Sequence, residues 1–171
     1  MNERPFEYSF VFDMIAQKKP CTLLDVGTGQ TSFPHLVNTC DVAAVGIDPD
    51  KKQIKKNTAY QPVLDDILAP KIKGQFDMVT CISVLEHVES YELAVKNMAA
   101  LLAPKGWLVM TFPFDEKYRV VYKTRKAFCQ AFSQELLDAW IENYSLNGPI
   151  HFKVTQWKDC DVVGVCLECA S

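Results

Sequence analysis

The chain has 171 residues, of which 49% are hydrophobic and 23% are charged. This length and composition fit one globular domain that buries roughly two thirds of its unfolded surface, and they exclude a disordered chain. The formal net charge of -3 provides no positive field for a phosphate backbone, so we expect no nucleic-acid partner.

The first residues, Met1-Asn2-Glu3-Arg4-Pro5, lead into a mixed segment without a long apolar run. Signal peptides and membrane spans need such runs, so we expect a cytoplasmic protein with no membrane partner. The seven cysteines are an odd number and are predicted to remain reduced. Cys166 and Cys169 have the spacing of a metal-binding pair, but no second pair accompanies them, and a final strand is the favoured interpretation.

Short apolar runs alternate with helical segments along the first two thirds of the chain. The runs that read as strands are residues 21–26, 42–47, 62–64, 76–82 and 107–112. This alternation predicts a mostly parallel sheet with helices on both faces.

Three helices are predicted between these strands. Residues 31–38 should form one, capped by Thr31 or Ser32 and with Pro34 in its first turn. Residues 50–57 should form another, with four lysines on a solvated side. Residues 91–102 have an amphipathic pattern that stops at Pro104-Lys105-Gly106.

The last third of the chain has a less regular pattern. Residues 113–132 show no clean period and are predicted to form a functional or mobile loop. A helix should follow from residue 133 to 140. The runs 151–156 and 162–169 are separated by a short polar connection and should pair in antiparallel fashion.

The clearest functional signal lies between the first strand and the first helix. Asp25-Val26-Gly27-Thr28-Gly29 ends a strand, and its glycines allow the backbone to turn tightly and to approach a ligand closely. Asp48 ends the second strand, 19 residues beyond Gly29. A carboxylate there can accept hydrogen bonds from both hydroxyls of a ribose. The alternative is that Asp48 caps a helix ahead of Pro49.

With these features, the sequence resembles the small-molecule group of class I S-adenosylmethionine-dependent methyltransferases. The matching segments, in chain order, are Leu24-Asp25-Val26-Gly27-Thr28-Gly29, Gly46-Ile47-Asp48, Asp66-Ile67, Ser83-Val84-Leu85-Glu86-His87-Val88 and Pro104-Lys105-Gly106-Trp107. The resemblance spans about residues 20 to 113. It implies a Rossmann-like, doubly wound α/β fold with a mostly parallel seven-stranded sheet, an antiparallel last strand and three layers.

The resemblance also implies how the cofactor, S-adenosyl-L-methionine, is held. Gly27 and Gly29 would pack against its methionine part, and Asp25 would hold the polar end of that part. Asp48 would bind the ribose. The adenine would meet Asp66 through its amino group and Ile67 through its ring. Four further cofactor contacts are expected, at Thr28, Pro49, Ser83 and Leu85.

One position departs from the family pattern, because Thr31 stands where many members have a third glycine. Its β-carbon would narrow the entrance to the cofactor site. His87 is the candidate general base, since imidazole suits proton removal near neutral pH. A role for His87 in packing or in cofactor positioning is the alternative, and Glu86 is a weaker candidate base.

The whole chain, residues 1–171, is predicted to be a single methyltransferase-like domain. Residues 1–19 would form a helical or lid segment, residues 20–113 the cofactor-binding core, and residues 114–171 the acceptor-side loop and the last strands. The aromatic series Phe6, Tyr8, Phe10 and Phe12 fits either a strand-like lid or one edge of a helix whose rings close over the cofactor, and core packing is the simpler interpretation. Five cations between Lys117 and Lys126 form either an anion site for the acceptor or a solvated surface.

The predicted reaction is methyl transfer to a small-molecule acceptor. An NAD-dependent oxidoreductase is one alternative, although its fingerprint places a glycine where this chain has Ser32. A non-catalytic module that binds S-adenosylmethionine is another. The segment beyond the core motifs is short, so a homodimer partner completing the acceptor pocket is a further expectation.

Overall fold

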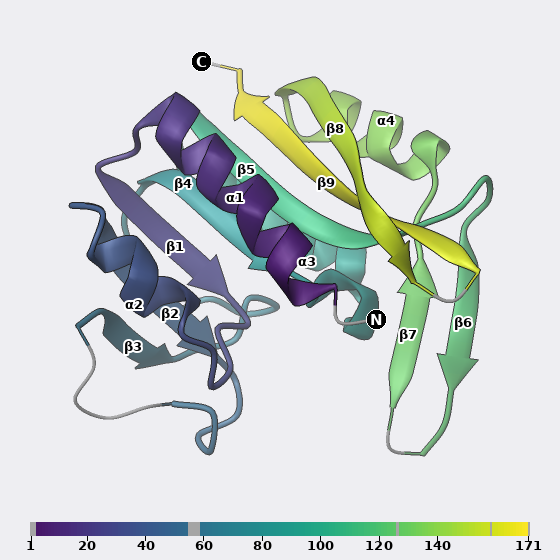
Figure 1. Ribbon diagram of the computed structural model, residues 1–171, viewed down its shortest axis with the longest axis horizontal. Coiled ribbons are helices and arrows are strands. Elements are labelled where there is room, and N and C mark those ends of the chain that lie inside the picture. Colours follow the sequence, from purple (N-terminus) through teal and green to yellow (C-terminus); the bar gives the residue numbers. More distant parts are fainter. Residues whose placement is uncertain (1–2, 55–58, 126, 158, 171) are drawn as a thin grey trace.

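The computed structural model describes residues 3–54, 59–125, 127–157 and 159–170. Figure 1 shows a twisted central sheet with helices on both faces and a separate two-stranded ribbon that projects from one end. In these residues the main sheet has seven strands. They are β1 (Thr22–Val26), β2 (Ala43–Asp48), β3 (Gln61–Leu64), β4 (Phe76–Ile82), β5 (Leu102–Phe114), β8 (Leu146–Trp157) and β9 (Cys160–Cys169).

The sheet has the spatial order β3-β2-β1-β4-β5-β9-β8. The pairs from β3 to β5 are parallel, whereas β9 runs antiparallel to both β5 and β8. The order of the strands reverses at β1, and a doubly wound sheet opens a ligand crevice beyond the carboxyl ends of the strands at such a point. The predicted fold class is therefore confirmed, and the crevice lies after β1 and β4.

Two hydrophobic cores lie on opposite faces of the sheet. Alternate residues of a strand point to opposite faces, so Leu23 enters one core and Leu24 the other. The first core is covered by α1 (Arg4–Lys18) and α2 (Phe33–Asn38). The second core is covered by α3 (Tyr91–Ala100) and α4 (Gln134–Asn143), with the short 3-10 helix η1 (Leu85–His87) beside it. The aromatic series near the N-terminus thus belongs to a helix.

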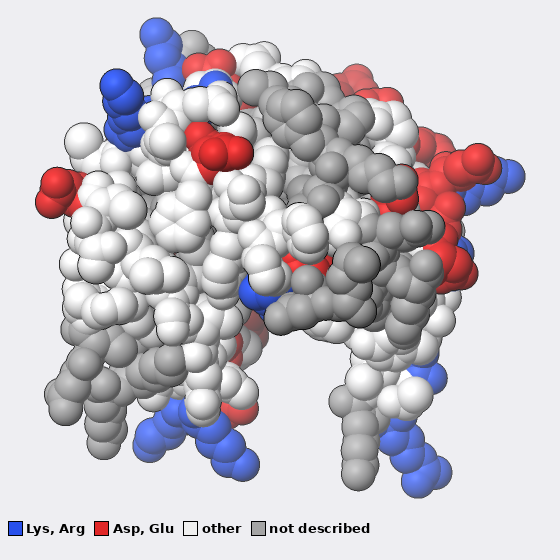
Figure 2. All heavy atoms as spheres, in the orientation of Figure 1, with Lys and Arg blue, Asp and Glu red and all other residues white. Residues whose placement is uncertain are grey.

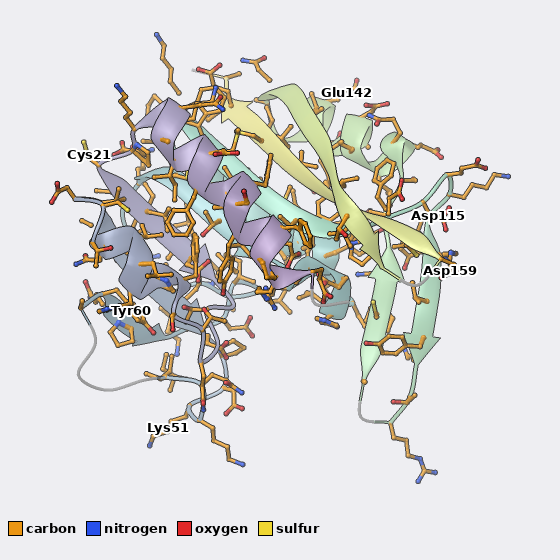
Figure 3. All side chains as sticks on the ribbon, in the orientation of Figure 1. Cys21, Lys51, Tyr60, Asp115, Glu142 and Asp159 are labelled. Atoms are coloured by element: carbon orange, nitrogen blue, oxygen red, sulfur yellow. The ribbon has the colours of Figure 1, made fainter. Side chains whose placement is uncertain are left out.

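The prediction of an irregular loop at residues 113–132 is wrong. This segment continues β5 to Phe114 and then forms a hairpin of two strands, β6 (Arg119–Lys123) and β7 (Phe128–Ala131). Its fold depends on contacts that are distant in sequence. Arg119 lies 2.6 Å from Asp115 and 2.9 Å from Asp159, and Figure 3 shows these two acids close together where the hairpin leaves the body. The local pattern of apolar and polar residues does not reveal these ion pairs, so it could not predict the hairpin.

Three smaller expectations are corrected. Residues 51–53 form a turn rather than the start of a helix, and residues 55–58 of that prediction lie outside the described residues. The expected turn at 104–106 is an irregular part of β5, where the pairing with β4 shifts register, because α3 already ends at Ala100. Ser32 is the N-cap residue of α2 but makes no side-chain cap, and the Thr31 hydroxyl instead donates to the Thr28 carbonyl at 2.9 Å.

Among the described residues, no helix is both long enough and apolar enough to cross a membrane.

Candidate functional site

The turn after β1 is built on two glycines in left-handed backbone conformation, Gly27 with φ +70° and Gly29 with φ +53°. A β-carbon on Gly27 would lie 2.6 Å from both methyl groups of Val84, whereas one on Gly29 would meet nothing closer than 3.9 Å. Glycine is therefore required at 27 by both conformation and space, and at 29 by conformation.

Asp48 joins this turn to the end of β2. Its carboxylate accepts a hydrogen bond from the Gly29 N–H at 3.0 Å and another from the Asp50 N–H at 2.9 Å. The Asp48 side chain is mostly buried. Its hydrogen bond with the Asp50 N–H is local, like the bond that a helix cap would make. The predicted convergence of the glycine turn and the acid at the second strand end is thus a direct contact.

Two cavities open on either side of the glycine turn, and they share Gly27 and Val84. The wide cavity has a volume of about 300 Å³. Its lining is mainly apolar and comprises Val26, Gly27, Ile47, Pro49, Asp65, Asp66, Ile67, Leu68, Val84, His87, Val88, Glu89 and Ser90. The narrow cavity has a volume of about 140 Å³. Its lining comprises Arg4, Tyr8, Asp25, Gly27, Thr28, Gly29, Thr31, Phe33, Ile82, Ser83 and Val84.

The wall of the wide cavity after β3 is held by the buried Asp65. This carboxylate accepts hydrogen bonds from the backbone N–H groups of Asp66, Lys71 and Ile72. Burial acts to raise the pKa of Asp65, but these donors outweigh it and the pKa is lowered. The charged Asp65 thereby anchors the loop that follows β3. Asp66 and Ile67, which belong to this loop, line the wide cavity.

His87 lies at the edge of the wide cavity with half of its side chain exposed. Its Nδ1 is 2.7 Å from the backbone carbonyl of Phe128 on β7. A carbonyl oxygen only accepts, so Nδ1 carries the proton of the neutral ring and Nε2 keeps a lone pair. The ring is therefore oriented with an acceptor nitrogen available.

Comparison with known proteins agrees with this geometry. Residues 7–148 match a family model described as a methyltransferase domain. The chain belongs to this methyltransferase family. Two curated relatives are the ubiquinone biosynthesis O-methyltransferases of Bordetella avium, 28% identical over 61% of this chain, and of Chromobacterium violaceum, 34% identical over 55%. The chain covers 47% and 44% of their lengths, so it spans about half of each.

Solved structures share the fold at low sequence identity. One is the 1,6-didemethyltoxoflavin-N1-methyltransferase of Burkholderia thailandensis, with a TM-score of 0.76, 13% identity and coverage of 99% of this chain and 78% of that one. Another is an S-adenosylmethionine-dependent methyltransferase from Clostridium acetobutylicum, with a TM-score of 0.72, 10% identity and coverage of 100% and 93%. At such identity these likenesses establish the architecture.

One buried carboxyl group, that of Asp25, lines the narrow cavity. Asp25 is 3% exposed, and burial raises its pKa to about 7. The hydroxyl of Thr80, which donates to Oδ1 at 2.8 Å, opposes this increase, as do Thr28 and the charge of Arg4, while Asp48 adds to it. Asp25 can therefore exist in either protonation state near neutral pH, which is the property needed to respond to a charged ligand.

This raised pKa predicts a pH dependence of stability. The unfolded chain releases the Asp25 proton near pH 3.8 and the folded chain near pH 7, so between these values the folded state holds the extra proton. The free energy of unfolding should then fall as pH rises, with a slope of up to about 1.4 kcal/mol per pH unit from this group. Urea unfolding across this range should show a shallower fall for Asp25→Asn. Parallel curves for the two proteins would contradict the prediction.

The N-terminal end of α1 is clamped against the ends of β4 and β5 by the fully buried Glu7. Its Oε1 accepts hydrogen bonds from the hydroxyls of Ser83 and, at 2.7 Å, Thr111. Arg4 donates to the Ile82 carbonyl at 2.9 Å. This clamp brings Arg4 to the wall of the narrow cavity, beside the left-handed residue Ser83 at φ +49°.

The hairpin is also fixed to the site. The buried Gln130 of β7 donates from Nε2 to the carbonyls of Leu85 and Val88, at 3.3 and 2.8 Å, and accepts from the Tyr118 hydroxyl at 2.8 Å. These bonds hold both ends of η1, which carries His87. The hairpin therefore determines where His87 lies.

At least two of the five cations predicted between Lys117 and Lys126 form ion pairs with acidic side chains. Arg119 is engaged by Asp115 and Asp159, and Lys123 pairs with Glu89 at 3.0 Å. Lys126 lies outside the described residues. Figure 2 shows cations at the end of the hairpin and at a second tip near β2 and β3, on either side of a notch. Within the described residues, no three His, Cys, Asp or Glu side chains are grouped as metal ligands.

The sequence-predicted cofactor residues lie at the two cavities with two exceptions. Leu85 is 1% exposed and packs into the core, and it lines neither cavity. Asp48 contacts the turn rather than the cavity lining. The predicted cofactor residues do not include Arg4 and Tyr8, which line the narrow cavity, or Val84, which lines both cavities. The spacing of Arg4 and Tyr8 on one helix face was the signal that could have identified the first two.

Proposed function

We propose that this chain binds S-adenosyl-L-methionine across the two cavities and transfers its methyl group to a small-molecule acceptor. The observation that carries this proposal is the contact between the Gly29 N–H and the Asp48 carboxylate. It joins the glycine turn to an acid at the end of β2, the position from which a carboxylate would bind the ribose of a nucleoside ligand. Family membership supports the reaction class. The names of the relatives favour an oxygen atom as the methyl acceptor.

The proposed binding mode follows the chemistry of the two cavities. The apolar wide cavity suits the adenine, with Ile67 and Pro49 against the ring and Asp66 toward its amino group. The narrow cavity suits the methionine part, because the Asp25 carboxyl can face an ammonium group and Arg4 a carboxylate. Gly27 and Val84 line both cavities, so a cofactor held in the two would pass this pair of residues.

When bound, S-adenosylmethionine supplies an activated methyl group on a positively charged sulfur. The chain must then orient the acceptor and exclude water around it, which is where most of the rate gain in such transfers originates. A hydroxyl acceptor also loses a proton as its oxygen bonds to the methyl carbon. Nε2 of His87 would receive that proton, since Nδ1 is committed to the Phe128 carbonyl.

Calorimetric titration tests the binding proposal. S-adenosylhomocysteine should bind the purified chain and NAD should not. Binding should release protons near neutral pH, because a ligand ammonium beside Asp25 favours its carboxylate form; Asp25→Asn should abolish that release. NAD binding without S-adenosylhomocysteine binding would indicate an oxidoreductase. Cofactor binding without methylation of any compound in a broad panel of hydroxyl and amine acceptors would indicate a non-catalytic module.

Replacement of His87 tests the proposed base. His87→Ala should lower turnover roughly 100-fold or more, in the range of general-base contributions, and should leave the affinity for S-adenosylhomocysteine within a few fold. His35→Ala on the exposed surface of α2 is the matched control and should retain full turnover. Turnover with labelled cofactor and the acceptor found in the panel is the measurement. Unchanged turnover in His87→Ala would remove His87 from the reaction.

A further inference from the structure

A third cavity, smaller than the other two, lies where five elements of the fold meet. Its volume is about 40 Å³. It shares Ser83 with the narrow cavity and His87 with the wide one. Its lining comprises Glu3, Ser83, Glu86, His87, Pro113, Cys129 and Val162. This small cavity therefore borders both halves of the proposed cofactor site without belonging to either.

The small cavity is lined by Glu86, a buried carboxyl group with one unsatisfied oxygen among the described residues. Glu86 is only 4% exposed, and no other described residue donates a hydrogen bond to its Oε2. Its Oε1 is 3.8 Å from Nε2 of His87, which is too long for a hydrogen bond. A buried polar atom left unsatisfied costs about 1–3 kcal/mol. Because Glu86 lines the small cavity, a ligand that enters this cavity could supply the missing partner.

We propose that the small cavity is a subsite for the methyl acceptor, in which Glu86 hydrogen-bonds a neutral hydroxyl or amino group of that molecule. The proposal rests on the proposed function, since an acceptor must lie close to the methyl group and therefore beside both cofactor cavities. It assigns Glu86 a role in recognition. The proton transfer assigned to His87 is separate from it.

The charges around the cavity determine the class of group that fits. Glu3 and the buried Glu7 are acidic neighbours of Glu86, and Arg4 is the opposing cation. Burial is the largest cause that raises the pKa of Glu86, to about 8. A protonated carboxyl both donates and accepts, so it complements a hydroxyl or an amine. A ligand carboxylate or phosphate would be repelled by the surrounding acids.

The volume limits the size of the group. A water molecule needs about 10–15 Å³ of such space, so 40 Å³ admits one functional group with an attached carbon. An aromatic ring does not fit. The body of the acceptor must lie outside the small cavity, on the side of His87 and the cofactor.

The experiment compares two probes of equal ring size, phenol and benzoate, on the isotope-labelled chain saturated with S-adenosylhomocysteine. Backbone amide resonances of Ser83, His87 and Cys129 should shift with millimolar phenol and not with benzoate. Glu86→Leu should abolish the phenol shifts and leave the dissociation constant of S-adenosylhomocysteine within about twofold. Glu86→Gln, which keeps hydrogen-bonding atoms of similar size, should retain the phenol shifts.

Three results would overturn the subsite. They are equal shifts with both probes, no shift at these residues with phenol, and phenol shifts that persist in Glu86→Leu. The second of these would mean that the cavity holds water alone. The cofactor titration is read in the same samples, so loss of the subsite with intact cofactor binding is distinct from failure of the proposed function. If the cofactor does not bind, phenol titration of the free chain still tests the cavity.

Discussion

Replacing Asp48 by alanine is expected to lower the affinity for S-adenosylhomocysteine by about 100-fold. The wild-type carboxylate accepts from the Gly29 and Asp50 N–H groups and would also accept from the ribose. Hydrogen bonds to a charged group contribute about 1.5–3 kcal/mol each, and about 1.4 kcal/mol is a factor of ten in affinity. Loss of the ribose contacts and of the bond that positions the turn together give the expected reduction. Isothermal calorimetry measures it directly.

Asp50→Ala is the matched control for this experiment. Asp50 is an exposed acid two residues along, and its side chain accepts a local hydrogen bond from the Lys52 N–H. Its replacement changes the net charge by the same amount as Asp48→Ala. The hydrogen bonds from the Gly29 and Asp50 N–H groups to Asp48 remain. The affinity should therefore stay within a few fold of the wild type. Equal losses in Asp48→Ala and Asp50→Ala would show that general charge, and not the geometry of Asp48, determines binding.

Replacing Gly27 by alanine should damage both stability and cofactor binding. The left-handed conformation at φ +70° costs an L-residue about 1–2 kcal/mol. The new β-carbon would also lie 2.6 Å from both methyl groups of Val84. Valine is stiff at χ1, so its displacement moves the wall that the two cavities share. We expect a loss of more than tenfold in affinity for S-adenosylhomocysteine, together with a lower free energy of unfolding in urea.

Two variants separate the two causes. Gly29→Ala meets only the conformational cost, because its β-carbon would contact nothing within 3.9 Å, and it should lose stability with a smaller loss of affinity. The double variant Gly27→Ala with Val84→Ala removes the collision and should regain part of the affinity but not the conformational cost. If Gly27→Ala and Gly29→Ala behave alike in both measurements, the collision with Val84 has no role.

Much of the cofactor-binding half could be predicted from sequence because its signals are local. β1, β2 and β4 are mainly apolar runs, and β4 has the bounds that its pattern predicts. The parallel order then places strand ends at one edge, so Gly29 and Asp48 meet as expected. The resemblance added Asp66 and Ile67, which lie at the wide cavity. Leu85 is buried in the core instead of lining a cavity, and a motif does not state which of its residues face inward.

The sequence by itself determined the sheet, the glycine turn and the acid that the turn contacts, since these depend on periodicity, on φ and on strand direction. Only the tertiary structure showed where α1 packs on the sheet, which residues surround Glu86, and that a hairpin follows β5. Arg119 pairs with Asp159, Glu7 with Thr111, and Gln130 with Leu85, and at least 39 residues separate the two partners in each pair. Such pairings stabilise a segment only when the chain has folded, so they leave no periodic trace along it.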